Sequence, residues 1–158
     1  MGYLRRINIT NFVVYDADPR YGSIISGIPG HDIEDLKLSN IRIYYKGGGT
    51  KEQTALVPPE NEKTYPEPRM FGEIPAYGFF IRHVKGLELN DVEVSYMNED
   101  FRPPFLLESM SQAELNNVKG QHASGVATLI LKDVEGFTIH NSPFMKDAKL
   151  VKVRDRQF

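Results

Sequence analysis

The chain has 158 residues, of which 41% are hydrophobic and 25% are charged, and its net charge is −2, as expected of one soluble domain. Acidic and basic residues are interleaved, which excludes the basic patch of a nucleic-acid-binding protein, and no apolar stretch has the length of a membrane span or of a signal-peptide core. The absence of cysteine excludes disulfides, zinc-thiolate sites and thiol catalysis.

A short apolar ladder that closes with Asn or Asp occurs five times along the chain. The copies span residues 4–11, 33–40, 84–91, 110–117 and 134–141. Their starting points are separated by 29, 51, 26 and 24 residues, so three steps have the length of one solenoid turn and one step carries an insertion. Apolar residues alternate with polar ones at the end of each copy, which predicts a strand with one buried face.

Further apolar runs accompany these ladders. Four precede a copy, one follows the last copy, and three come directly after the Asn or Asp. The runs that precede a copy span 23–26, 78–81, 105–107 and 127–131. The run after the last copy spans 150–153, and the runs after an Asn or Asp span 12–14, 41–43 and 92–94. Up to three short strands per repeat, each stacked in parallel on its equivalent, predict an all-β right-handed parallel β-helix. We expect a solenoid of about five coils that forms a single domain over residues 1–158.

The residue that closes each ladder has a mechanical interpretation. Asn tolerates the left-handed backbone conformation that a turn between strands requires, and stacked Asn side chains can bond to one another along a solenoid. The residues concerned are Asn11, Asn40, Asp91, Asn117 and Asn141. Because the position recurs in every repeat, whereas a binding site would occupy only a few, we interpret these residues as structural.

The insertion spans about residues 44–77 and is rich in Pro and Gly, which precludes regular structure. Its three consecutive glycines at 47–49 do not form a phosphate loop, because the Gly-Lys end of that motif is absent. Two interpretations remain open. The insertion is either an excursion pinned to the solenoid wall by Tyr65, Met70, Phe71 and Tyr77, or a loop that shapes a ligand site.

Three segments of the chain carry a resemblance to a known family. Residues 20–31, the turn at 47–50 and residues 65–83 resemble bacterial members of glycoside hydrolase family 28, the polygalacturonase and rhamnogalacturonan hydrolase family. The family fold is a right-handed β-helix, and the resemblance corresponds to its C-terminal coils. It implies that this chain is the C-terminal portion of a longer pectin-degrading hydrolase of carbohydrate metabolism, from a family whose members are usually exported.

The catalytic motifs of that family are absent from this chain. The family carries its aspartates on an Asn-Thr-Asp motif and an Asp-Asp pair, supported by Gly-His-Gly and Arg-Ile-Lys motifs, and none of the four occurs here. The segments Arg6-Ile7-Asn8 and Gly30-His31-Asp32 are accidental partial matches. We therefore expect this chain alone to be inactive as a glycosidase, and the sequence leaves open whether it belongs to an enzyme.

Acidic clusters of the chain's own provide weak alternatives to the missing motifs. An inverting glycosidase needs two carboxyl groups about 6.5–9.5 Å apart on one face. The candidate clusters are Asp16 and Asp18, then Asp32, Glu34 and Asp35, then Glu99 and Asp100. Each lies at a turn or strand start, which favours solvated turn residues. The histidines at 31, 83, 122 and 140 lack metal-ligand spacing, so we expect neither a metal nor another cofactor.

Two classes of function follow from these observations. The chain is either a segment of a pectinase-like hydrolase that supplies scaffold and sugar contact, or a non-catalytic module that binds polysaccharide or serves as structure. Arg and Lys pair with uronate carboxylates, and Tyr stacks on sugar rings. The candidate contacts are Arg20, Tyr21, Lys46, Arg69, Tyr77 and Arg82. Packing beneath the insertion is the equally weighted alternative for the aromatic residues.

The two ends of the predicted solenoid differ in composition. Residues 149–156 mix Lys, Arg and Asp into the last strand, which blunts an edge against further pairing. The first strand begins at Leu4 and has no comparable charges or capping helix. An uncapped coil is a template for another chain, so we expect either self-association through the N-terminal coil or continuity with upstream coils.

Overall fold

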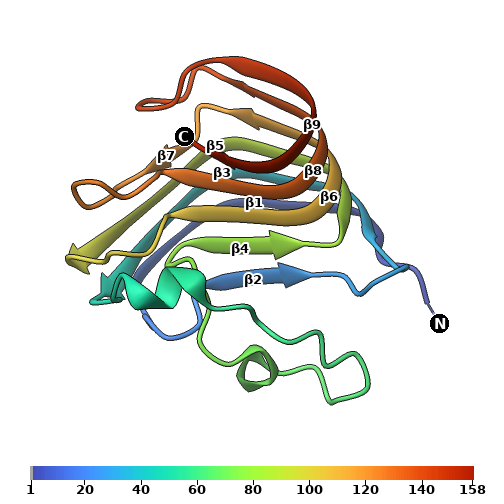
Figure 1. Cartoon of the computed structure of the whole chain (residues 1–158), viewed down its shortest axis with the longest axis horizontal. Coiled ribbons are helices and arrows are strands. Elements are labelled where there is room, and N and C mark those ends of the chain that lie inside the picture. Colours follow the sequence, from blue (N-terminus) through green and yellow to red (C-terminus); the bar gives the residue numbers. More distant parts are fainter. Residues whose placement is uncertain (1) are drawn as a thin grey trace.

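The computed structural model describes residues 2–158, and in this range it contains nine β-strands, two short 3-10 helices and no α-helix (Figure 1). The strands are β1 (Arg5–Ala17), β2 (Ser23–Ser26), β3 (Ile33–Gly47), β4 (Phe79–Arg82), β5 (Val84–Asn98), β6 (Phe105–Asn116), β7 (Lys119–Gly120), β8 (Leu129–His140) and β9 (Ala148–Gln157). The helices η1 (Glu52–Ala55) and η2 (Pro68–Phe71) lie in the insertion. The predicted all-β class is confirmed.

Successive repeats lie side by side in parallel register. One ladder runs from β1 through β3 to β5 and on to β6 and β7, and a second runs through β2, β4, β6 and β8. Figure 1 shows β2, β4, β6 and β8 stacked one above the other, with β1, β3 and β5 behind them. Leu36 of β3 lies opposite Ile7 on one side and Leu87 on the other. Equivalent apolar residues therefore stack on one another through the core.

The separate short strands predicted on either side of each Asn are joined in the structure. β3, for example, continues through 15 residues and passes two left-handed residues, Asp35 and Asn40. The equivalent corners of β5 have Gly86 and Asp91 in the same conformation. Because each corner faces a corner of the same shape in the next repeat, strand pairing continues on both sides of it.

The Asn and Asp residues at this corner bond to one another in pairs, and no bond links Asn40 to Asp91 in the part of the chain that the structure describes. Asn40 donates from Nδ2 to Oδ1 of Asn11 at 2.9 Å, and Asn117 donates to Oδ1 of Asp91 at 2.6 Å. The five residues predicted at this corner all have positive φ angles between 51° and 60°. Asn141 departs from the pattern, since it donates to Asn116 and not to Asn117. The predicted role of these residues in shaping the corners is confirmed.

The sheet of β2, β4, β6 and β8 is buried on both faces. Its inner face contributes Ile81, Leu107 and Leu131 to the main core. Its outer face carries Phe80, Leu106 and Ile130, on which Phe71, Ile74 and Ala76 of the insertion side pack. The insertion thus covers the outside of this sheet, and Figure 1 shows it, coloured teal to green, beside β2.

The insertion is shorter than predicted. β3 runs to Gly47 and β4 begins at Phe79, so the linking segment spans residues 48–78 instead of starting near residue 44. Tyr45 stays in the strand because its ring is 1% exposed and contacts Tyr77 edge-on at 5.6 Å between ring centroids. Of the residues predicted to pin the insertion, Phe71 packs on the sheet, whereas Tyr65 is 83% exposed and pins nothing.

A buried ion pair joins three distant parts of the chain. Arg102 donates from Nε and Nη2 to the two carboxylate oxygens of Asp100 at 3.0 and 2.7 Å. The same guanidinium donates to the carbonyl of Pro19, and the carboxylate also accepts from the amide of Gly49. Asp100 and Arg102 are 0% and 1% exposed, so the prediction that Asp100 is a solvated turn residue is wrong. No residue pattern around Asp100 and Arg102 predicts that the pair is buried.

Replacing Asp100 by Ala will destabilise the fold severely, because it leaves the Arg102 guanidinium buried without a counter-charge. Such losses amount to about 3–5 kcal/mol. Asp18→Ala is a matched control, since Asp18 and Arg20 form the same two-residue pairing at 2.7 Å on the surface. Urea unfolding of both variants checks this. Equal losses in the two variants would contradict the role assigned to the buried pair.

The chain ends in an antiparallel strand. From the sequence we expect the run at 150–153 to form a further parallel strand of the solenoid. In the structure this run belongs to β9, which pairs antiparallel with β8. Only residues 141–147 connect the two strands, which suits a hairpin and is too short for a parallel crossover. Val151 is 87% exposed among charged neighbours, so the charged edge predicted for this end is present.

The other end of the stack has an exposed strand. β1 pairs only with β3 among the described strands, and Ile9 and Val13 are 40% and 54% exposed. Ile7 and Phe12 pack on the core but are only partly covered. A long unpaired edge with apolar side chains is a template for pairing with another chain.

We expect this chain, studied alone, to self-associate through β1. Ile9→Lys places a charge on that edge and will lower the apparent mass seen by light scattering across a dilution series. Val151→Lys, on the exposed β9, is the control and will leave the mass unchanged. A wild-type chain that remains monomeric at all concentrations would contradict the expectation.

Candidate functional site

The insertion is fixed to the sheet by Arg82, a residue predicted to contact sugar. Its Nη1 and Nη2 donate to the carbonyls of Pro58 and Pro59 at 2.8 Å each, and its Nε donates to Ser26 Oγ at 3.0 Å. The side chain is 3% exposed. All three guanidinium nitrogens of Arg82 donate to groups of the protein, and the side chain is buried. The predicted glycan contact at Arg82 is therefore wrong.

A second contact reinforces this attachment. Glu60 of the insertion lies 2.9 Å from His83 Nε2 through one carboxylate oxygen, and 3.4 Å from the Arg82 guanidinium through the other. The Arg82 guanidinium also lies 5.5 Å from the ring centroid of Phe71, within cation–π range. The insertion is therefore held by charge and by aromatic packing at the same strand end.

Tyr77, another predicted sugar contact, is a core residue. It is 0% exposed, donates to the carbonyl of Gln121 at 2.6 Å and packs edge-on between Tyr45 and Tyr96. Burial raises the pKa of the Tyr77 hydroxyl well above its ordinary value. Tyr77 therefore packs inside the main core, which differs both from the predicted sugar contact and from the alternative of packing beneath the insertion.

A pocket of about 340 Å³ lies between the insertion and β2, and we call it the insertion pocket. Tyr21 and Phe71 provide aromatic lining, and Ile24 and Met70 provide aliphatic lining. Ser26 and Glu67 add polar groups to the same wall. The pocket thus combines ring faces with a few hydrogen-bonding groups, a composition common in small-ligand sites.

Three of the predicted sugar contacts lie in or beside the insertion pocket. Tyr21 lines it, Arg69 is exposed on η2 between two lining residues, and Arg20 stacks on Tyr21 with its guanidinium 5.2 Å from the ring centroid. Arg20 also binds Asp18 through both carboxylate oxygens, and this bonding lowers the pKa of Asp18 to about 2. Lys46, the remaining candidate, does not line the pocket and lies 3.6 Å from Asp16.

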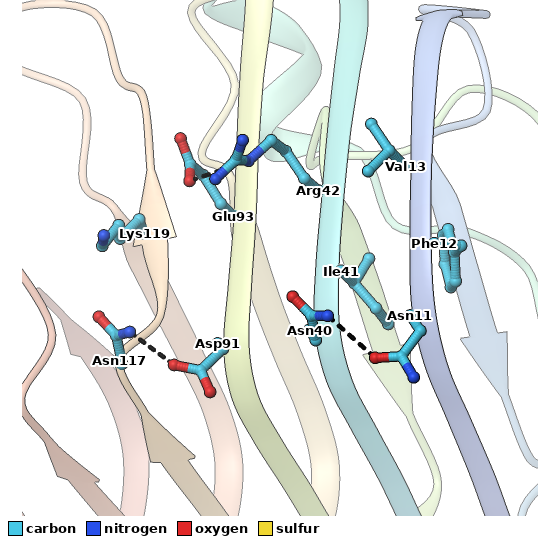
Figure 2. Close-up of a pocket in the computed structure, with 10 residues that line it drawn as sticks. All are labelled: Asn11, Phe12, Val13, Asn40, Ile41, Arg42, Asp91, Glu93, Asn117 and Lys119. Atoms are coloured by element: carbon cyan, nitrogen blue, oxygen red, sulfur yellow. Dashed lines mark hydrogen bonds and ion pairs between the residues drawn. The ribbon is translucent and has the colours of Figure 1, made fainter.

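A second hollow follows the Asn ladder, and sequence reasoning missed it. This ladder groove has a volume of about 370 Å³ (Figure 2). It is lined by Asn11, Phe12, Val13, Asn40, Ile41, Arg42, Asp91, Glu93, Asn117 and Lys119. The lining residues come from β1, β3, β5 and the start of β7, so the groove crosses four neighbouring strands. The alternation of outward side chains in the repeats was the signal that could have located it.

Three carboxylates of the candidate acidic clusters are paired with cations and not with one another. Asp16 lies beside Lys46, Asp18 is bound by Arg20, and Asp100 is bound by Arg102. Each of these carboxylates has a cation as its near neighbour. Within residues 2–158 no group of three or more His, Asp or Glu side chains has the arrangement of a metal site.

Comparison with protein-family models, with characterised proteins and with solved structures finds no match to this chain. No helix in the described part of the chain is long and apolar enough to cross a membrane.

Proposed function

We propose that this chain is a segment of a right-handed parallel β-helix that belongs to a pectin-degrading glycoside hydrolase and contributes scaffold and sugar contacts to it. The insertion pocket carries the proposal. It is the place where the segments that resemble glycoside hydrolase family 28, residues 20–31 and 65–83, come together around Tyr21 and Phe71.

The arrangement of strands supports the β-helix part of the proposal. The strands β2, β4, β6 and β8 stack in parallel, and the first three are followed by β3, β5 and β7, which stack in the other ladder. Connections between parallel strands of one sheet are right-handed in nearly all proteins. A coil that repeats with this hand is the simplest path for the chain.

The chemistry of the pocket supports sugar contact. A pyranose ring presents an apolar face to an aromatic side chain, and Tyr21 lines the pocket with such a ring. Arg69 is exposed next to the pocket and can pair with the carboxylate of a uronic acid. The aspartates that would perform hydrolysis lie, in this proposal, on coils outside this chain.

A non-catalytic polysaccharide-binding or structural module is the second candidate. The observation in its favour is that the insertion pocket is complete within these residues, from β2 to η2. A longer natural form of the protein that contains the missing motifs would decide for the hydrolase, and a natural form of this length would decide for the module.

We expect the isolated chain to bind oligogalacturonides at the insertion pocket without cleaving them. Tyr21→Ala will weaken binding by about threefold to tenfold, because aromatic stacking contributes about 0.5–1.5 kcal/mol. Arg69→Ala will weaken it by up to about fivefold, because an exposed charge pair contributes about 0.2–1 kcal/mol. Tyr65→Ala, which removes an exposed ring of the insertion outside the pocket, is the control. Isothermal titration calorimetry measures the affinities.

A reducing-end assay on the same samples tests the absence of cleavage. Product release from polygalacturonate that disappears in Asp16→Asn or Asp18→Asn would show that this chain carries its own catalytic carboxylates. Affinities that are identical in wild type, Tyr21→Ala and Arg69→Ala would remove the insertion pocket from the proposal.

A further inference from the structure

The ladder groove continues into an aromatic surface that the insertion pocket does not share. Beyond Val13 and Arg42, the next outward residues of β1 and β3 are Tyr15 and Tyr44, because the residues between them face the core. The two rings stack at 4.9 Å between centroids with an interplanar angle of 9°. Tyr15 is 68% exposed, so its ring remains accessible although it is stacked on Tyr44.

The polar groups of the groove are spaced regularly. Asn11, Asn40, Asp91 and Asn117 occupy one corner on four neighbouring strands, and neighbouring strands lie about 4.8 Å apart. This spacing is comparable with the length of one sugar residue in an extended polysaccharide chain. Asn40 and Asn117 use their amide nitrogens to donate to the neighbouring side chain. Figure 2 shows that their amide oxygens point away from these bonds.

The charges of the groove balance one another. Its ten lining residues include two cations, Arg42 and Lys119, and two anions, Asp91 and Glu93. Arg42 Nε lies 3.4 Å from Glu93, and Asp91 accepts from Asn117. A groove without net charge offers a polyuronate no excess of cations to offset the desolvation of its carboxylates, whereas an uncharged chain carries no such cost.

We propose that the ladder groove and the Tyr15–Tyr44 stack together bind an uncharged, extended polysaccharide chain. One sugar ring lies against Tyr15, and hydroxyl groups of the adjoining sugars bond to the amides of the ladder and to the Arg42–Glu93 pair. This surface lies on β1, β3 and β5, whereas the insertion pocket lies on β2, so the proposal does not rest on the function proposed above.

Calorimetric titration of the whole chain with oligosaccharides of neutral β-1,4-galactan, arabinan, xylan and glucan tests this proposal, with oligogalacturonides of matched length as the charged comparison. At least one neutral glycan will bind. Tyr15→Ala and Arg42→Ala will each weaken that binding by about threefold to tenfold, as expected for the loss of stacking or of a charge-assisted hydrogen bond. Tyr15→Phe keeps the ring and will bind like wild type.

The control variants separate the two surfaces. Tyr21→Ala alters the insertion pocket and will leave neutral-glycan binding unchanged. Lys149→Ala, which removes an exposed cation of β9 outside the groove, will also leave it unchanged. Thermal unfolding of each variant verifies that it folds. The proposal is overturned if no neutral glycan binds, or if Tyr15→Ala and Arg42→Ala bind like wild type. It is also overturned if the groove binds oligogalacturonides more tightly than neutral glycans and Lys119→Ala abolishes that binding.

Discussion

The fold depends on the superposition of corners in successive repeats. Residues at equivalent corners, such as Asn11 and Asn40, adopt the same left-handed conformation, so each repeat bends where its neighbour bends. Only then can Leu36 and Leu87 stack in the core while Lys37 and Glu88 pair on the surface at 2.7 Å. A slip of one residue would reverse the buried and exposed faces of a strand. Side-chain alternation and corner geometry therefore fix the same register.

The candidate sites follow from this register in different ways. The ladder groove is built by repetition, since it uses the same outward positions on neighbouring strands. The insertion pocket is formed by the insertion, which departs from the repeat. Arg82 at the end of β4 holds the insertion by donating to the carbonyls of Pro58 and Pro59. Two hollows with different lining thus occur on one small scaffold. One is balanced in charge, and the other is lined by Glu67 and flanked by the exposed Arg20 and Arg69.

Periodic features of the structure could be predicted from the sequence, and features that depend on a single contact could not. The ladders, their parallel stacking and the Asn corners leave a signal in every repeat. Arg82 and Tyr77 carry no such signal, because an isolated Arg or Tyr in a sequence is equally compatible with ligand contact and with burial in the protein. The burial of Asp100 depends on Arg102, Gly49 and Pro19, which only the folded chain brings together. The antiparallel pairing of β9 likewise follows from the short connection at residues 141–147. The composition of β9 does not reveal this direction.

The parallel register itself can be tested by engineered disulfides, because the chain contains no cysteine. Lys37 and Glu88 are exposed register partners, and parallel neighbours about 4.8 Å apart are within disulfide reach. Replacing both by Cys should give rapid cross-linking on mild oxidation, seen as a mobility shift under denaturing conditions. Cys at Lys37 and Asn90, which lie two residues out of register at about 8 Å, should not cross-link. Equal cross-linking of the two pairs, or cross-linking of the second pair alone, would contradict the register on which the fold and both surfaces rest.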